Sequence, residues 1–185
     1  KVIVLMENHS SQNRILNTQR LKLIPFAEEH CSGLNLLDSD PDVMRYIGDG
    51  RTKSAEETME VIQKVKSRWQ EFGFSWWAIV HKELGEIIGS GCLQHISNKP
   101  DAALEIGWRL RPDTQGKGYA TEAGLVIIQY AFETIGAPSV LAVANPENGP
   151  SQRVMQRLGM TYIGIHNYYD QPCVTYELCN PKGTG

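Results

Sequence analysis

The residues from Arg111 to Ala120 (RPDTQGKGYA) most constrain this chain, because they separate a short apolar run from a long amphipathic one. Two glycines, Gly116 and Gly118, fall in this turn with Lys117 between them. Glycine lets the backbone approach a ligand closely and adopt positive φ without a Cβ clash. A helix that begins here directs its first unpaired N–H groups, and the positive end of its dipole, into the turn. The stretch therefore predicts an anion site, most often one for phosphate.

Three kinds of phosphate loop use such glycines, and the flanking residues separate them. A dinucleotide-binding fingerprint requires a third glycine at the position of Thr121. A P-loop requires Ser or Thr after Gly-Lys, whereas Gly118 follows Lys117. The third pattern, Gln/Arg-x-x-Gly-x-Gly/Ala, fits Gln115, Gly118 and Ala120 at each specified position. The stretch thus resembles the loop of the GCN5-related N-acetyltransferase (GNAT) superfamily.

A second motif occupies the segment from Asn148 to Met160 (NGPSQRVMQRLGM). It resembles the Asn-x-x-Ser…Leu-Gly-Phe segment of the RimJ/RimL-like branch of that superfamily, the branch of ribosomal-protein alanine acetyltransferases. The resemblance extends from Arg20 to Leu178 and is silent on the substrate. Three further segments are similar to the same branch, namely Arg20–Phe26, Asp40–Tyr46 and Glu105–Trp108.

The resemblance implies an α/β (α+β) chain with the GNAT acyl-CoA N-acyltransferase fold. That fold has a mixed, mostly antiparallel twisted sheet of about seven strands, flanked by about four helices. We expect a single domain over residues 20–180. Residues 1–19 are largely polar and aperiodic, which predicts a loose N-terminal segment. The chain begins with Lys1, so whether Met6 is the native start is left open.

Local patterns predict the elements of the first half. Alternating apolar residues predict a strand over 20–26, and Pro25 places it at the edge of a sheet. A short helix is expected over 27–37. Residues 54–57 (SAEE) form a capping box, and the apolar residues behind it recur at three- and four-residue steps. This pattern predicts a long amphipathic helix that ends at Gly73.

The second half alternates between short strands and helices. Strands over 74–80, 86–96 and 102–110 are separated by short turns, which implies antiparallel pairing. A helix over 120–135 allows the next strand to lie parallel to 102–110. The remaining expected elements are a strand over 139–144, a helix over 151–158, and strands over 161–165 and 173–178 around a turn near residues 170–172.

Composition excludes several classes of protein. The chain has 185 residues, of which 41% are hydrophobic and 21% charged, as in a globular protein with a sizeable core. Its net charge of −3 argues against a nucleic-acid partner, and no apolar run approaches the length of a membrane span. The four cysteines show neither C-x-x-C nor metal-ligand spacing. We expect reduced thiols, no metal, a cytoplasmic location, and a monomer or homodimer.

The resemblance implies acetyl-CoA as cosubstrate. Backbone N–H groups of the glycine loop would hold the pyrophosphate, and the pantetheine would lie along strand 102–110. Leu110 is the expected N–H donor to the thioester oxygen, a contact of ~3 kcal/mol in the transition state. Alternative roles are helix capping for Asn148, packing for Tyr119 and solvation for Lys117. The expected cofactor-binding residues are Trp108, Arg109, Leu110, Arg111, Gln115, Gly116, Lys117, Gly118, Tyr119, Ala120, Asn148 and Ser151.

Acyl transfer to an amine requires a base, because an ammonium group with a pKa of ~10 must lose a proton. Glu105 lies in a strand that is otherwise apolar except for Arg109, where burial would raise the pKa of its carboxyl toward the useful range. The resemblance also places a carboxylate there. Two alternatives are open: a structural Glu105 that pairs with an arginine or caps the strand, and His95 as the base.

The departing thiolate requires a proton, and here the chain departs from the family pattern. Many members have a Tyr seven residues after the motif Asn, where this chain has Met155. The branch places Ser151 near the thiol, so Ser151, or a water that it holds, is one candidate acid and solvent is the other. Cys92 and Cys173 have no adjacent base in the sequence, which argues against a covalent acyl-cysteine.

The acceptor side is the least specified by the sequence. Four aspartates either attract a cationic amine at the mouth of the site or belong to a solvated loop: Asp38, Asp40, Asp42 and Asp49. Three tryptophans either wall the acceptor pocket or pack in the core, with core packing expected for at least two: Trp76, Trp77 and Trp108.

The predicted function is that of an acetyl-CoA-dependent N-acetyltransferase, in which a primary amine attacks the thioester directly in a ternary complex. A protein N-terminus is one possible acceptor, and a small amine such as a polyamine, amino acid or aminoglycoside is another. Two alternatives come from other classes. One is a non-catalytic acyl-CoA-binding module, which Met155 leaves open; the other is a nucleotide-dependent enzyme that uses the glycine loop.

Overall fold

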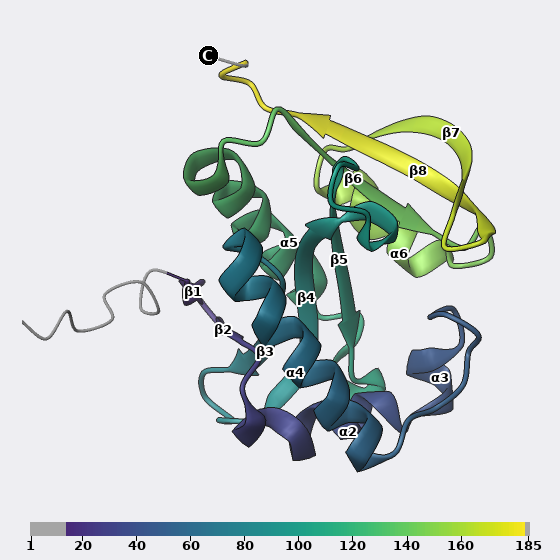
Figure 1. The fold of residues 1–185 in the computed structure, drawn as a ribbon. Helices are drawn as coiled ribbons and strands as arrows, with labels where there is room; N and C mark the ends of the chain where they lie inside the picture. Colours follow the sequence, from purple (N-terminus) through teal and green to yellow (C-terminus); the bar gives the residue numbers. More distant parts are fainter. Residues whose placement is uncertain (1–13, 184–185) are drawn as a thin grey trace, which may run out of the picture.

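The computed structural model describes residues 14–183, and its central feature is an eight-stranded sheet (Figure 1). The strand order is β1-β2-β3-β4-β5-β6-β8-β7, and only the β5–β6 pair in the described residues is parallel. The expected mixed, mostly antiparallel α/β fold is therefore confirmed. The strands are β1 Leu16–Asn17, β2 Leu21–Pro25, β3 Trp76–His81, β4 Ile87–His95, β5 Leu104–Leu110, β6 Ser139–Ala144, β7 Thr161–Tyr168 and β8 Gln171–Cys179.

Helices cover both faces of this sheet. In Figure 1, α2 and α4 lie in front of the central strands and α5 lies behind them. None of the helices within residues 14–183 has the length and apolar character needed to cross a bilayer. The helical segments are η1 Glu28–His30, α2 Cys31–Asp38, α3 Pro41–Met44, α4 Ala55–Phe72, η2 Ile96–Asn98, η3 Pro112–Thr114, α5 Tyr119–Gln129, η4 Tyr130–Ile135 and α6 Gly149–Arg157.

The N-terminal edge of the sheet differs from the sequence-based expectation. Residues 16–17 form β1 and pair antiparallel with β2, so residues 14–19 are not loose and β2 is not an edge strand. The turn between them is closed by Thr18, whose N–H donates to the Leu21 carbonyl while its hydroxyl accepts from the Leu21 N–H, both at 2.9 Å. The sheet therefore has one strand more than the seven expected. Residues 1–13 lie outside the described part of the chain.

The helix ends predicted from capping residues and glycines are present in the structure. Ser54 and Glu57 form the reciprocal capping box at the start of α4, and Gly73 ends that helix with φ +78°. The helix expected over 120–135 forms as α5 and continues as the π-helical η4, which ends at Gly136. The acidic segment near Asp40 is more ordered than a turn, because its carboxylate caps the short α3.

The sheet opens between β5 and β6. The two strands share one backbone pair, Glu105 with Leu141, and no further pair joins them in the described residues. At the end of β5, the Arg111 N–H donates to the backbone of β4 at 2.7 Å. Because backbone groups alternate in direction along a strand, the N–H groups of Trp108 and Leu110 point away from β4, toward the opening. Strand β6, the predicted parallel neighbour of β5, thus leaves some backbone N–H groups of β5 unpaired, and these groups can bond another molecule.

A buried ion pair joins β5 to the helices that cover it. The Arg109 guanidinium and the Asp38 carboxylate are 2.5 Å apart, and their side chains are only 12% and 3% exposed. Ser90 of β4 accepts from Arg109 Nε at 2.8 Å, and the Thr58 hydroxyl of α4 donates to Asp38 at 2.7 Å. The pair therefore fixes α2 and α4 relative to the central strands.

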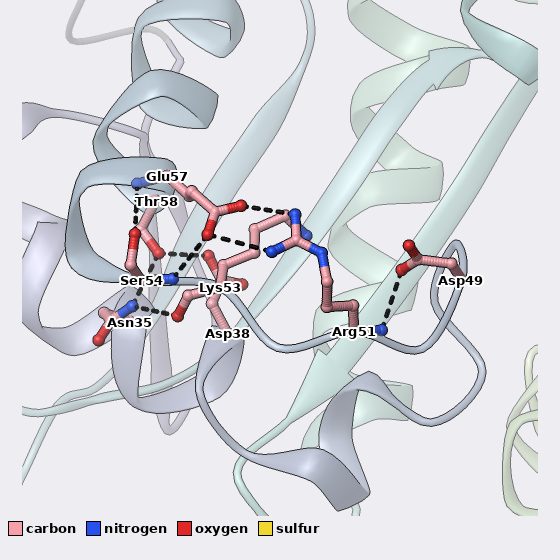
Figure 2. A network of polar contacts seen from close by, with 8 residues as sticks. All are labelled: Asn35, Asp38, Asp49, Arg51, Lys53, Ser54, Glu57 and Thr58. Carbon is pink, nitrogen blue, oxygen red and sulfur yellow. Dashed lines mark hydrogen bonds and ion pairs between the residues drawn. The ribbon is translucent and has the colours of Figure 1, made fainter.

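Figure 2 shows how the same network anchors residues 45–54, the connection between α3 and α4. The Asn35 side chain donates to the Lys53 carbonyl at 3.1 Å. Arg51 forms an ion pair with Glu57 at 2.7 Å, and this contact lowers the pKa of Glu57 to about 2. The connection is thus held at its α4 end by one neutral hydrogen bond and by one ion pair that is fully charged at neutral pH.

Replacing Asp38 with Ala should leave the Arg109 guanidinium without its counter-ion in the interior. We expect the free energy of unfolding, measured in urea, to fall by ~3 kcal/mol. Asp42→Ala is the matched control, because Asp42 pairs with Arg45 where both side chains are more than half exposed. That variant should stay within ~0.5 kcal/mol of the wild type. Equal losses in the two variants would contradict the special role of the buried pair.

Candidate functional site

The opening beside β5 is part of a cleft of about 940 Å³. Its walls come from α3 and the loop after it, β5, the start of α5, α6 and the β7–β8 turn. In Figure 1, α3 and the β7–β8 turn lie on the same side of the molecule. Most of the residues expected in the site line this one cleft: Glu105, Trp108, Arg109, Leu110, Gln115, Gly116, Gly118, Tyr119, Ala120, Asn148 and Ser151.

Two expected residues do not line the cleft. The Arg111 guanidinium is turned to Asp113 and Glu86, at 2.6 and 3.1 Å. Lys117 is exposed, and its carbonyl accepts from Arg20 Nη1 at 3.0 Å. Both residues were expected to contact the cofactor because they are close to the glycine loop in sequence. In the structure, the Arg111 side chain is engaged in ion pairs and the Lys117 side chain points to solvent.

The glycine loop has the backbone geometry that its sequence predicts. Gly116 and Gly118 have φ values of +74° and +84°, which other residues rarely adopt. Gly118 is the N-cap of α5 without any side-chain cap. Within residues 14–183, none of the N–H groups from Gly116 to Thr121 donates to a protein acceptor. The start of α5 therefore offers several free donors and a positive dipole end to an anion.

Gln115 supports the loop rather than extending from it. Its amide Nε2 donates to the Leu110 carbonyl at 3.3 Å, which fixes the turn between β5 and α5. Tyr119 has a packing role as well as a place in the cleft wall. Its hydroxyl lies 3.1 Å from His81 Nε2, and the Arg20 guanidinium stacks 4.4 Å from its ring centroid.

Glu105 lies on β5 directly opposite Gln94 of β4 and is only 5% exposed. Burial raises the pKa of Glu105 to about 7, against the opposing effect of a hydrogen bond from Gln94 Nε2 at 3.0 Å. The Tyr169 hydroxyl donates to the same carboxylate oxygen, Oε1. Glu105 is not paired with an arginine in the described structure, and Arg109, the arginine of the same strand, pairs with Asp38 instead. The geometry thus gives a carboxyl in the cleft that gains and loses a proton near neutral pH.

His95, the rival base, lies outside the cleft. Its ring packs against Phe72 and Phe74 with centroid distances of 5.1 and 5.3 Å. Its Nδ1 is 2.9 Å from the Ala102 carbonyl. These contacts describe a structural histidine at the end of β4.

The second sequence motif forms the start of α6. Asn148 caps this helix, since its Oδ1 accepts from the Ser151 N–H at 3.3 Å. Asn148 therefore caps the helix through Oδ1, which is one of the two roles considered from the sequence, and its side chain also lines the cleft. Ser151 is half-buried in the cleft wall, and its hydroxyl has no partner in the described structure. Met155, one turn further on, is buried and faces the same cleft without a group that could donate a proton.

The two cysteines of the cleft wall are poor nucleophiles. Both Cys92 and Cys173 are buried. Burial raises the pKa of the Cys92 thiol well above its usual value, and it raises the pKa of the Cys173 thiol as well. Because the thiolate is the reactive form, an acyl-cysteine route is disfavoured.

The aspartates expected at the mouth are used by the protein itself. Asp38 is buried in its ion pair with Arg109, Asp40 caps α3, and Asp49 accepts from the Arg51 N–H at 2.9 Å. Asp38 and Asp42 do line the cleft, but each is paired with an arginine, Arg109 and Arg45 respectively. Asp40 and Asp49 instead bond backbone N–H groups of their own turns, as in the alternative of a local acidic loop.

The tryptophans divide between the cleft and the core. Trp77 is fully buried and packs on Trp69 and Tyr130, as expected for a core residue. Trp76 and Trp108 both line the cleft, and both are also partly buried against the core, so core packing holds for at least two of the three as expected. The alternation of side chains along β3 explains the split between the neighbouring Trp76 and Trp77.

Sequence reasoning missed two residues of the site, Gln94 and Tyr169. Both contact Glu105, one from the neighbouring strand and one from the β7–β8 turn. Gln94 could be identified only from the register of β4 and β5, which pairs it with Glu105; the sequence alone does not give that register. Tyr169 was missed because the turn was expected at residues 170–172, whereas β8 already begins at Gln171.

Comparison with known proteins agrees with this geometry. The acetyltransferase (GNAT) domain family matches residues 20–161. An FsC-acetyl coenzyme A-N(2)-transacetylase of Aspergillus fumigatus is 31% identical over 165 residues, which cover 85% of this chain and 69% of that relative.

Solved structures share the fold. An acetyltransferase from Agrobacterium tumefaciens is 28% identical, with a TM-score of 0.74 over 89% of this chain and 93% of its own. RimL, a ribosomal L7/L12 α-N-protein acetyltransferase solved with coenzyme A, has a TM-score of 0.76 at 19% identity, over 89% and 97% of the two chains. The chain therefore belongs to the GNAT acetyltransferase family and is an N-acetyltransferase.

Proposed function

We propose that this protein transfers the acetyl group of acetyl-CoA to a primary amine by direct attack in a ternary complex. One observation carries the proposal. A buried carboxyl with a pKa of about 7, Glu105, lies in the same cleft as a helix start with unpaired N–H groups. An anion site and a base in one cleft are what acyl transfer from a diphosphate-bearing thioester to an amine requires.

The residues present fit acetyl-CoA. The N–H groups of Gly116 to Ala120 would hold the pyrophosphate, with the α5 dipole adding to the attraction. The free backbone edge of β5 would bond the pantetheine arm, and the N–H of Leu110 would face the thioester oxygen. The cleft of about 940 Å³ is large enough for a ligand of drug size or larger.

Glu105 would act as the general base for the amine. A base works best when its pKa lies near the working pH, and burial brings Glu105 to that range. In its ionised form it would accept a proton from the ammonium of the acceptor, either directly or through one water. The neutral amine could then attack the carbonyl carbon.

Ser151 is the candidate for protonating the departing thiolate. Its hydroxyl is free of protein partners in the described residues and lies in the cleft wall beside Met155. A serine hydroxyl, or a water that it orients, would replace the tyrosine that many family members carry at the position of Met155. Proton uptake from solvent is the competing route, and Ser151→Ala separates the two by its effect on turnover.

The acceptor class that we favour is a small-molecule amine. The relative with the higher identity, at 31%, is named for N(2)-transacetylation. A protein N-terminus is the second candidate, since RimL is named for that activity, but at 19% identity that likeness concerns the fold alone. The two aspartates that line the cleft, Asp38 and Asp42, are each paired with an arginine, which reduces the negative charge available there to select a polycation.

Release of free thiol from acetyl-CoA tests the proposed function. The panel would contain spermidine, amino acids, an aminoglycoside, and peptides with a free Ala or Ser N-terminus. We expect amine-dependent thiol release with at least one member, and mass spectrometry should show acetylation on its amine. Tight binding of acetyl-CoA without release for any amine, in the panel or in a cell extract, would contradict the proposed reaction.

Gly118→Ala tests the role of the glycine loop. A Cβ at φ +84° strains the backbone and turns the adjacent N–H groups away from a common focus. We expect the affinity for coenzyme A, measured by calorimetry, to fall at least about tenfold. Gly136→Ala is the matched control, because Gly136 has a similar φ of +74° and ends the helix away from the cleft. Its variant should lose similar stability but retain coenzyme A binding.

Glu105→Gln tests the base. We expect turnover at pH 7 to fall by about a hundredfold, with the affinity for coenzyme A nearly unchanged. The wild-type rate should rise with pH as Glu105 ionises near pH 7, and this rise should be absent in the variant. Glu133→Gln, on the exposed side of η4, is the control. Normal turnover of Glu105→Gln would remove Glu105 from the mechanism.

A further inference from the structure

The tip of the β7–β8 hairpin crosses the opening in the sheet. β8 pairs with β6, on the far side of the opening from β5. Nevertheless the tip residue Tyr169 contacts the near side twice. Its N–H donates to Ser97 Oγ at 3.4 Å, at the end of β4, and its hydroxyl donates to Glu105 of β5. The hairpin thereby bridges two parts of the sheet that have few backbone bonds between them.

The backbone at this tip is unusual for its residues. Tyr169 and Asp170 form a two-residue connection with φ values of +54° and +59°. Turns of this kind favour Asn, Asp and Gly, because other side chains clash at positive φ. Tyr169 is also 38% exposed, so burial of its ring does not explain its presence. Compared with Asn, Asp or Gly, a tyrosine at this position adds a hydroxyl group that donates a hydrogen bond to Glu105.

Two donors converge on one oxygen of Glu105. Gln94 Nε2 and the Tyr169 hydroxyl both bond Oε1, and Gln94 Nε2 also lies 3.2 Å from the Tyr169 oxygen. The orientation of the Gln94 amide is determined by Trp76, whose indole N–H is a donor only and lies 3.0 Å from Gln94 Oε1. The amide must therefore turn its NH₂ group to Glu105. The second oxygen, Oε2, has no partner among residues 14–183.

We propose that Tyr169 is a positioning residue for acetyl transfer, which together with Gln94 holds Oε1 of Glu105 and leaves Oε2 to accept the proton of the acceptor amine. This inference rests on the proposed role of Glu105 as the base. It assigns the β7–β8 tip to the acceptor end of the cleft, because the glycine loop lies at the opposite end of β5. The reaction step is one proton transfer, from the ammonium nitrogen to Oε2.

The groups around Glu105 leave Tyr169 and Gln94 as its main polar partners. The thiols of Cys92 on β4 and Cys173 on β8 interact with it, but burial raises the pKa of both, so they are neutral at pH 7. Strand β6 has no titratable side chain. Three further ionisable groups of adjoining elements are engaged elsewhere: Arg109 with Asp38, Glu122 with Arg20, and His95 with the Ala102 carbonyl. Arg153 and Arg157 of α6 also line the cleft, but neither contacts Glu105 in the described structure.

Loss of the Tyr169 hydroxyl should change the titration of Glu105 in a defined direction. A hydrogen bond donated to a carboxylate stabilises the ionised form and lowers its pKa. Removing the donor therefore raises the pKa of Glu105, and a smaller fraction of the protein carries the ionised base at pH 7. A tyrosine that only packed at the hairpin tip would leave this titration unchanged when its hydroxyl is removed.

The test is a carbon-13 NMR titration of side-chain carboxyls in the full chain labelled at glutamate, with the Glu105 signal identified by its loss in Glu105→Gln. In Tyr169→Phe we expect the midpoint of Glu105 to rise by about one pH unit. Tyr168→Phe, one residue away, is the matched control and should titrate as the wild type. An unchanged midpoint in Tyr169→Phe overturns the proposal.

A second variant separates positioning from stability. Asn suits the left-handed backbone at this position, so Tyr169→Asn should relieve strain and keep the melting temperature at or above that of the wild type. Its side chain is too short to reach Glu105, so the same upward shift of the Glu105 midpoint is expected. A lower melting temperature with an unchanged midpoint would mark Tyr169 as structural.

The outcome is distinguishable from failure of the proposed function. If Glu105→Gln turns over normally, the base assignment and this inference fall together. If Glu105→Gln is inactive while Tyr169→Phe keeps both the wild-type midpoint and the wild-type pH profile of thiol release, only this inference falls.

Discussion

The interrupted pairing between β5 and β6 is the constraint on which the rest of the site depends. One backbone pair, Glu105 with Leu141, holds the two strands together, and beyond it they diverge. The divergence exposes N–H groups along β5 and opens the cleft between α6 and the start of α5. It also places Glu105 at the narrow end, where burial raises its pKa to about 7. A continuous ladder at this position would pair the N–H groups of β5 and fill the space proposed for the acetyl donor.

The two buried carboxylates near the cleft, Asp38 and Glu105, have different kinds of partner. The carboxylate of Asp38 pairs with Arg109, a cation of the cleft wall, and Glu105 has no arginine partner in the described structure. Had Arg109 been free to bind Glu105, the attraction would have lowered the pKa of that carboxyl and weakened it as a base near neutral pH. The groups that contact the proposed base in the described structure are therefore hydrogen-bond donors, Gln94 and Tyr169, rather than a cation.

The parts of the account that were predictable from sequence are those determined by local chemistry. Gly116 and Gly118 required positive φ, Ser54 and Glu57 capped each other, and Glu105 stood out as the one carboxylate of a largely apolar strand. Contacts between distant segments were not predictable in the same way. The pairing of Asp38 with Arg109 and the reach of Tyr169 to Glu105 depend on register and hairpin length, and each strand end was uncertain by a few residues.

The most direct measurement of the central claim is a map of backbone amide shifts on addition of acetyl-CoA, recorded by nitrogen-15 NMR. Binding of the pyrophosphate by main-chain donors predicts the largest shifts, and new protection from hydrogen exchange, at Gly116, Gly118 and Ala120. Smaller shifts should follow along β5 at Trp108 and Leu110. Shifts concentrated elsewhere, with the amides of residues 116–120 unmoved, would contradict the claim that this loop holds the donor.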